Sequence, residues 1–210
     1  MKDEILTAIS EGVLEGATEL VVNSVKKAVE AGMPASEILN SGLIAGMNEV
    51  GVLFRDGEMF VPEVLVSAKA LQAGIEIIRP ALTAEGVEAA GKILTVTVEG
   101  DLHDIGIKLV GMMLEGAGFE VVNMGIDVKA EDIVAKVREV RPDILALSAM
   151  LTTTMTNMKG VMDALKEAGL IDSVKVMVGG APLSHEAAEK LGAYYSADAS
   201  EAVTVAKSLL

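Results

Sequence analysis

The feature that most constrains the fold is an alternation of apolar, strand-like runs with helical segments after residue 91. Five short runs are each followed by a segment with helical periodicity. The runs cover residues 92–98, 119–124, 143–148, 175–178 and 193–196. Strands alternating with helices of this length predict βαβ units and a parallel sheet. Five such units predict a flavodoxin-like (Rossmann-like) α/β domain in strand order 2-1-3-4-5, with its ligand expected beyond the first and third strands.

Residues 1 to about 84 show helical periodicity, which predicts four helices. We expect Ser36 to cap the third helix, and the fourth to start near Pro62 and end near Ile78, before Pro80. Four helices with short connections predict a four-helix bundle. The small and polar residues 83–91 are the expected linker, which gives a helical domain at 1–88 and an α/β domain at 89–210.

Charge and composition argue against several classes of protein. The formal net charge of −14 argues against nucleic acid and against an anionic membrane surface. Without cysteine there is no disulfide, thiolate metal site or thiol nucleophile. The charged, amphipathic start of the chain is unlike a signal peptide, and no apolar run approaches membrane-spanning length. We therefore expect a soluble, cytoplasmic protein.

His103, one of two histidines, follows the first predicted strand and lies two residues after Asp101. A carboxylate that accepts a hydrogen bond from one ring nitrogen makes the other nitrogen a better ligand or base. Three interpretations stay open at this point: a metal ligand, a general base or a phosphoryl-accepting histidine. No further His, Cys or carboxylate cluster is evident, so a single histidine suits a metal that brings its other ligands in a macrocycle.

Small and hydroxyl residues follow the other strands at the same edge. Ser148 and the run Thr152–Thr154 precede a predicted helix, and three hydroxyls in a row exceed what a helix cap requires. Gly106 fits either helix–strand packing or close approach by a ligand. The pair Gly179-Gly180 fits either a tight turn or space for a flat group.

Taken in order, these residues resemble the D-x-H-x-x-G … S-x-L … G-G signature of vitamin B12-binding domains. Here it reads Asp101-x-His103-x-x-Gly106, then Ser148 to Met150, then Gly179-Gly180. Residues 46–54 and 57–64 resemble the helical cap of methylcobalamin-binding proteins. The whole chain resembles the free-standing corrinoid proteins of methylotrophic and O-demethylating methyltransferase systems, and is similar to the cobalamin-binding modules of methionine synthase.

The sequence departs from that family pattern at four places. Ile107-Lys108 stands where Lys-Asn is usual, and Met150 where Leu is usual. Thr154 replaces a serine but keeps the hydroxyl, and Val61 replaces a larger leucine. None of these changes removes the histidine.

The resemblance implies a cobalamin or related corrinoid whose cobalt cycles between cob(I)alamin and methylcob(III)alamin. It implies that His103 is the lower axial ligand of cobalt, with Asp101 and Thr154 as its hydrogen-bonded relay. Phe54 and Val61 would shield the upper face, and the remaining residues would hold the cofactor and its displaced nucleotide tail. The implied cofactor-binding set is Phe54, Val61, Asp101, Leu102, His103, Asp104, Ile105, Gly106, Ser148, Met150, Leu151, Thr152, Gly179 and Gly180.

By the same resemblance the chain is a methyl-carrier subunit rather than a complete enzyme. A substrate:corrinoid methyltransferase would load it, and a second methyltransferase acting on coenzyme M or tetrahydrofolate would unload it. A reductive activase is a further implied partner. The methyl donor stays open among methylamines, methanol, methoxylated aromatics, betaines and methyl thiols.

Three alternatives remain. A B12-dependent sensor usually carries a DNA-binding or signalling module, and light-sensing ones rely on a cap tryptophan, while these 210 residues contain no Trp and no basic segment. The cobalamin subunit of an adenosylcobalamin-dependent mutase generally lacks the helical bundle. A flavodoxin-like domain without a corrin requires the whole motif set to be coincidental.

Overall fold

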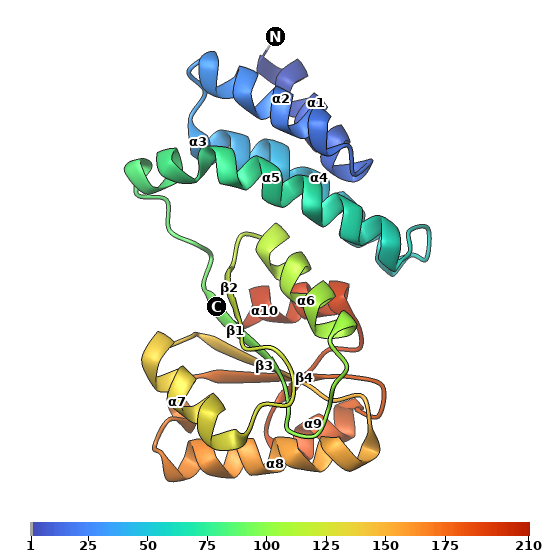
Figure 1. Cartoon of the computed structure of the whole chain (residues 1–210), viewed down its shortest axis with the longest axis vertical. Coiled ribbons are helices and arrows are strands. Elements are labelled where there is room, and N and C mark those ends of the chain that lie inside the picture. Colours follow the sequence, from blue (N-terminus) through green and yellow to red (C-terminus); the bar gives the residue numbers. More distant parts are fainter. Residues whose placement is uncertain (1) are drawn as a thin grey trace. The chain divides into compact units, whose positions relative to one another are not determined.

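The computed structural model describes residues 2–210, which divide into two compact units (Figure 1). The first ends at Glu88 and includes the turn Gly116–Gly118. The second comprises Ala89–Glu115 and Phe119–Leu210. Within residues 2–210, no helix is both long enough and apolar enough to cross a membrane.

The first unit is built from four helical segments, as predicted. They are α1 (Lys2–Leu14), α2 (Thr18–Glu30), the unbroken run α3 (Ala35–Glu37), η1 (Ile38–Ile44) and α4 (Ala45–Arg55), and α5 (Val61–Glu85). The core contains fully buried aliphatic side chains from each segment, including Ile9, Val25, Ile38 and Leu71. Gly46 lets α1 and α4 pack closely, because a Cβ there would lie 2.5 Å from the carbonyl oxygen of Ser10.

Two predicted helix ends in this unit are wrong, and one residue explains both. Ser36 does not cap the third helix, which begins one residue earlier, at Ala35. The carboxylate of Glu85 instead accepts the backbone N–H groups of Ala35 at 2.7 Å and Ser36 at 3.0 Å. Helix α5 continues through Pro80 to Glu85, and its C-cap is Gly86 in the left-handed conformation. The connection starts at Gly86 rather than at residue 83.

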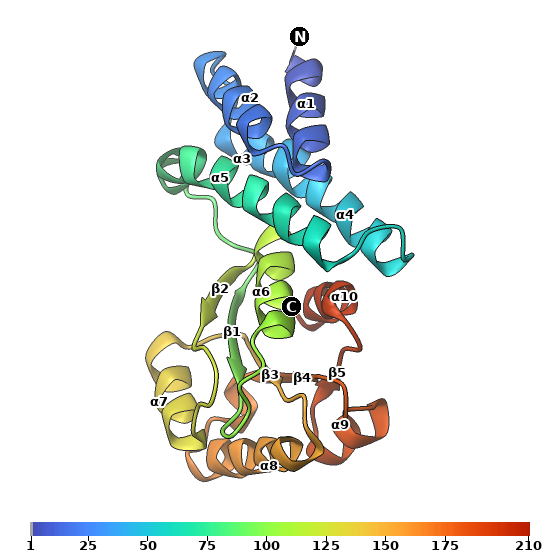
Figure 2. The same ribbon diagram turned by 45° about the vertical axis from the view of Figure 1, so that its right-hand side comes forward.

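The second unit is a parallel sheet flanked by helices. The elements are β1 (Lys92–Thr97), α6 (Ile105–Gly116), β2 (Glu120–Asn123), α7 (Ala130–Val140), β3 (Ile144–Ser148), α8 (Thr152–Glu167), η2 (Ile171–Ser173), β4 (Lys175–Gly179), α9 (His185–Leu191), β5 (Tyr194–Tyr195) and α10 (Ala199–Leu209). The strand order β2-β1-β3-β4-β5 confirms the predicted topology. Figure 2 shows α6 and α10 on one face of the sheet and α7, α8 and α9 on the other.

The sheet register sets the position of the functional edge. Leu94, Val96 and Val98 join the core beneath α7 and α8. Because side chains alternate along a strand, Thr95 and Thr97 face the side of α6. Thr97, Ser148 and Gly179 are aligned across β1, β3 and β4, so three neighbouring strands end at one level. The loops that follow these strands therefore meet at one edge.

Candidate functional site

The loop between β1 and α6 turns sharply at its start. Gly100 has a φ of +80°, and the N–H of Asp101 donates to the carbonyl oxygen of Val98 at 3.2 Å. The turn buries the side chain of Asp101 completely. Two residues later, 54% of the His103 side chain is exposed. A buried carboxylate therefore stands directly behind an accessible imidazole.

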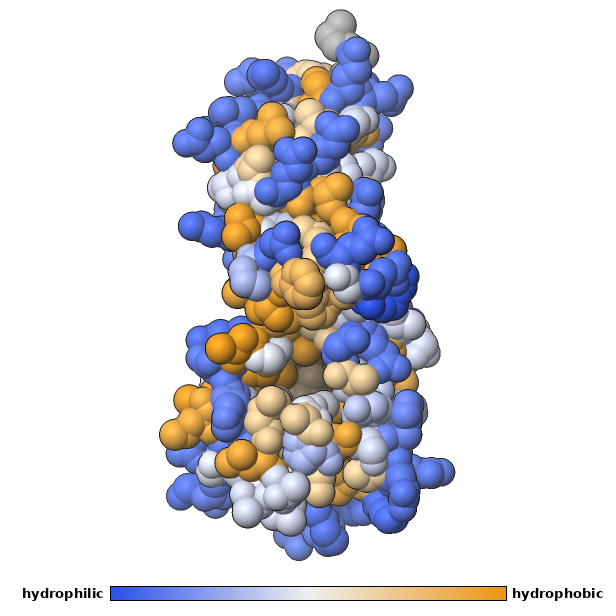
Figure 3. Space-filling view, turned by 90° about the vertical axis from the view of Figure 1, so that its right-hand side faces the viewer, coloured by the Kyte–Doolittle hydropathy of each residue, from blue (hydrophilic) through white to orange (hydrophobic). Residues whose placement is uncertain are grey.

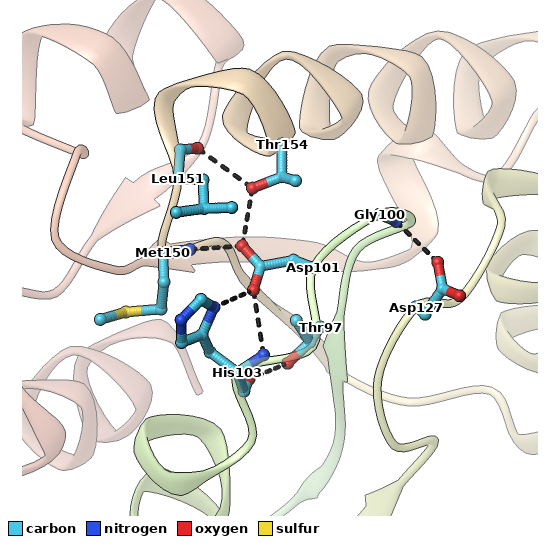
Figure 4. Close-up of polar contacts among 8 residues, drawn as sticks. All are labelled: Thr97, Gly100, Asp101, His103, Asp127, Met150, Leu151 and Thr154. Carbon is cyan, nitrogen blue, oxygen red and sulfur yellow. Dashed lines mark hydrogen bonds and ion pairs between the residues drawn. The ribbon is translucent and has the colours of Figure 1, made fainter.

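The carboxylate of Asp101 is the centre of a hydrogen-bond network (Figure 4). One oxygen accepts Nδ1–H of His103 at 2.7 Å and the backbone N–H of His103 at 3.1 Å. The other accepts the N–H of Met150 at 2.7 Å and the hydroxyl of Thr154 at 2.6 Å. With its hydrogen on Nδ1, the ring keeps the lone pair of Nε2 available. The network thus prepares Nε2 as a ligand or base.

The charge on Asp101 follows from this network. Burial by itself would raise the pKa of Asp101, because a buried carboxylate loses hydration. Hydrogen bonds from Thr154, from the N–H of Met150 and from His103 outweigh burial and hold the pKa of Asp101 well below its usual range. Asp101 is therefore a carboxylate at neutral pH and stabilises the N–H on Nδ1 of His103.

The threonine run after β3 lies inside the first turn of α8, which begins at Thr152 rather than near residue 154. The residue before the helix, Leu151, makes no side-chain cap. Of the run, Thr154 is buried and donates to Asp101, while Thr152 and Thr153 are exposed. The structure therefore brings Thr154 to the Asp101–His103 pair.

Large apolar side chains are exposed around this pair. Isolated exposed apolar residues are ordinary, and Figure 3 shows several among the hydrophilic ones on the face that it draws. In the second unit, however, five of the seven exposed large apolar side chains follow β1, β2 or β3 at this edge. They are Leu102, Ile105, Ile126, Met150 and Leu151. An exposed apolar surface around a histidine suits a large, flat, apolar ligand.

The three glycines of the motif have different surroundings, which give different reasons for a glycine at each position. A Cβ at Gly180 would lie 1.8 Å from the carbonyl oxygen of Ala149, so the backbone alone requires a glycine there. A Cβ at Gly179 would approach the carbonyl oxygen of Ser196 to 3.1 Å. Around Gly106 nothing lies within 4 Å of the Cβ position, so helix–strand packing does not account for that glycine. The surface at Gly106 is open.

The remaining residues of the predicted set are spread over both units. Ser148 ends β3 and is nearly buried. Asp104 pairs with Lys108, four residues on, and this pairing lowers the pKa of Asp104. Phe54 is in the last turn of α4 and Val61 is the first residue of α5, both half-buried in the first unit.

Sequence reasoning missed three residues that bond to the loop. The hydroxyl of Thr97 donates to the carbonyl oxygen of His103 at 3.1 Å. Asp127 accepts the N–H of Gly100, and Asn157 donates to the carbonyl oxygen of Glu99. The one available signal was that Asp127 follows the second predicted strand at the same edge. Within residues 2–210 no group of three His, Cys, Asp or Glu side chains is placed to hold a metal ion.

Comparison with known proteins finds matches over nearly the whole chain. Two family models match the chain, both described as B12 binding domain, over residues 91–206 and 5–79. Dimethylamine corrinoid protein 2 of Methanosarcina acetivorans is 45% identical over 100% of this chain and 97% of its own.

Two solved structures are similar over the whole fold. A cobalamin-binding protein from Desulfitobacterium hafniense has a TM-score of 0.81 at 34% identity, covering 98% of each chain. The methanol:cobalamin methyltransferase complex from Methanosarcina barkeri has a TM-score of 0.88 at 32% identity, covering 100% of this chain and 80% of the matched one.

Fold, site and matched models define a B12-binding protein with an N-terminal helical region. Within that class, the chain belongs to the family of corrinoid proteins that includes the dimethylamine corrinoid proteins of Methanosarcina.

Proposed function

We propose that this protein is a methyl carrier that holds a corrinoid at the Asp101–His103 edge. The observation that carries the proposal is the network around the buried Asp101, which leaves Nε2 of an exposed His103 free as a ligand. The role also accords with the family to which the chain belongs.

The residues at this edge fit a corrinoid. Such a ligand has broad, flat ring faces and brings most of its metal's ligands with it, so Nε2 of His103 would hold its metal. The exposed side chains of Leu102, Ile105 and Met150 supply apolar contact beside that nitrogen. Gly106 leaves open surface where the nucleotide tail would approach the sheet. We assign Ser148, Met150, Thr152 and Gly179 to the path of the tail.

When bound, a corrinoid supplies a cobalt atom that accepts and releases methyl groups, while the protein binds and orients it. Asp101, by accepting the Nδ1–H of His103, makes Nε2 a stronger ligand. Thr154 and the N–H of Met150 hold the carboxylate in place. A proton taken up by the Asp101–His103 pair would weaken Nε2 as a donor, so the pair would set how strongly the protein holds the metal.

We propose that residues 1–88 form a cap for this site. Phe54 and Val61 are half-buried, so each keeps some apolar surface exposed for a covering role. An apolar cap excludes water from a reactive centre until a partner displaces it.

The partners follow from the carrier role. The similar structure from Methanosarcina barkeri is a methanol:cobalamin methyltransferase complex, and the 45% identical relative is named for dimethylamine. On that basis we propose a methylamine as the methyl source, delivered by a substrate:corrinoid methyltransferase. A second methyltransferase would pass the methyl group to coenzyme M or tetrahydrofolate, and a reductive activase would restore the protein after oxidation.

The test is the visible spectrum of the protein reconstituted with hydroxocobalamin, compared with His103→Ala. We expect a bound corrin in both proteins and a spectral shift from histidine ligation in the wild type only. His185→Ala is the matched control, because His185 packs against Tyr195 at the start of α9. Failure of the wild type to retain a corrin would overturn the proposal. An unchanged spectrum in His103→Ala would overturn the ligand assignment alone.

A further inference from the structure

Two side chains outside the Asp101–His103 hydrogen-bond network make hydrogen bonds to the backbone of the loop that carries this pair. Asp127 comes from the loop after β2, and Asn157 from the second turn of α8. They bond to the loop across 27 and 58 residues of sequence. Both are exposed, so neither is needed to fill the core.

Asp127 makes hydrogen bonds to the backbone of both Gly100 and Asp101. One carboxylate oxygen accepts the N–H of Gly100 at 2.7 Å, and its own backbone N–H donates to the carbonyl oxygen of Asp101 at 3.1 Å. Asp127 makes both hydrogen bonds from a left-handed backbone, with a φ of +55°. Asp and Asn tolerate this left-handed conformation better than most residues with a side chain.

Asn157 holds the other side of the same turn. Its Nδ2 donates to the carbonyl oxygen of Glu99 at 2.7 Å. The consecutive residues Glu99, Gly100 and Asp101 thus each bond to a residue outside the loop through a backbone group. Gly100 is in a left-handed conformation, which without these bonds leaves its backbone free to adopt others.

The position of this turn decides where the carboxylate of Asp101 points. That carboxylate is bonded to Nδ1 of His103, so a displaced turn changes which ring nitrogen carries the hydrogen. We infer that Asp127 and Asn157 are positioning residues that clamp the 99–101 turn and thereby keep Nε2 of His103 free for cobalt. This inference rests on the proposed function, and it concerns how the ligand is prepared rather than whether a corrinoid binds.

The test uses the full-length chain without cofactor, labelled with ¹⁵N-histidine. The chain has only two histidines, so nitrogen–proton correlation spectra resolve the tautomer of each. We expect the wild type to hold its hydrogen on Nδ1 of His103. Asp127→Gly and Asn157→Asp should each lower the Nδ1–H to Nε2–H ratio by about fivefold, the effect of one ordinary hydrogen bond. The signal of His185 should not change.

Matched variants separate positioning from a general effect on stability. Asp127→Asn keeps an acceptor and tolerates the left-handed backbone, so it should restore the wild-type ratio. Arg141→Gly is the control for adding a glycine, because within residues 2–210 Arg141 is the other non-glycine residue with positive φ. Thr156→Asp is the control for the charge that Asn157→Asp adds to α8. Both controls should leave the ratio unchanged.

Hydroxocobalamin affinity gives a second readout. Asp127→Gly and Asn157→Asp should weaken binding by about fivefold, while Asp127→Asn does not. Wild-type ratios in both Asp127→Gly and Asn157→Asp would overturn the inference, as would an equal shift in Arg141→Gly. If Asp127→Gly does not fold, Asn157→Asp and its control decide the matter. A wild type that binds no corrin refutes the proposed function, whereas the tautomer ratio still tests the clamp.

Discussion

At the scale of single residues, the site depends on how many donors reach one buried carboxylate. The hydroxyl of Thr154 donates to Asp101 at 2.6 Å, and Thr154 itself is buried. Thr154→Val keeps the shape but removes this donor, and hydrogen bonds to charged groups contribute about 1.5–3 kcal/mol. We expect Thr154→Val to lose about that much free energy of unfolding in urea denaturation, and Thr154→Ser to lose less. Equal stability of the valine variant and the wild type would contradict this view.

Two of the three motif glycines, Gly106 and Gly180, should respond in opposite ways to alanine. Gly180→Ala places a Cβ against the carbonyl oxygen of Ala149 at a φ of +130°, so we expect a marked loss of thermal stability. Gly106→Ala meets no atom within 4 Å and sits in the first turn of α6, so it should fold at least as well as the wild type.

Binding distinguishes the roles of these glycines further. If the nucleotide tail crosses Gly106, a Cβ there weakens hydroxocobalamin binding by about tenfold or more, roughly the cost of a misplaced methyl group in a packed contact. Titration of the folded Gly106→Ala protein measures this effect. Unchanged affinity would mean that the tail takes another path.

The sequence revealed the chemical centre of the site but not its support. Asp101 and His103 are recognisable because residue type, spacing and position after a predicted strand agree, and the resemblance to methionine synthase adds Thr154. Asp127 and Asn157 were not, because their bonds join residues 27 and 58 positions apart and neither side chain stands out in its own segment. Contacts of this kind depend on the packing of β2 and α8 against β1, which local patterns do not encode.

At the scale of elements, the strand order followed from the alternating pattern, but two helix ends did not. A proline near the end of an apolar stripe predicts that a helix stops before it. In α5 the helix continues five residues beyond Pro80, and its last residue, Glu85, caps α3. The acceptor for the start of α3 is thus supplied by a residue 50 positions away, and Ser36 is not needed as a cap.

This cap makes the stability of the first unit sensitive to acid. Hydrogen bonds from the N–H groups of Ala35 and Ser36 lower the pKa of Glu85 below its ordinary value. A carboxylate with a lowered pKa stabilises the fold above its unfolded pKa of about 4.3, and that contribution disappears as the pH falls through the folded value. We expect Glu85→Gln to be less stable than the wild type at pH 7 in thermal unfolding. The difference should shrink below pH 4.

The exposed Glu88, three residues further along, provides the control for Glu85. Glu88→Gln should match the wild type in thermal unfolding at pH 7. If Glu85→Gln matched the wild type at pH 7, the Glu85 carboxylate would have no part in capping α3.

At the scale of the whole molecule, every polar contact of the Asp101–His103 network lies within the second unit. The proposed function assigns only the apolar residues Phe54 and Val61 of the first unit to the site. On that proposal the α/β unit would hold the ligand and the helical unit would cover it. We therefore expect the second unit alone to be enough for holding the cofactor, and both units to be needed for shielding it.

The connection between the units allows this separation to be tested in the intact protein. Residues 86–91 form neither helix nor strand, are mostly exposed, and include Glu88. We expect a glutamate-specific protease to cut here, because exposed irregular segments are cleaved before packed ones. The α/β fragment should then retain hydroxocobalamin within about tenfold of the intact affinity and keep the His103-dependent spectrum, since Nε2 of His103 and its hydrogen-bond network remain complete.

The same fragment should lose shielding, so a bound reduced corrinoid should oxidise in air faster than in the uncut protein. A fragment that binds no corrin would mean that the helical unit holds the cofactor as well as covering it, and equal oxidation rates would mean that Phe54 and Val61 do not shield it.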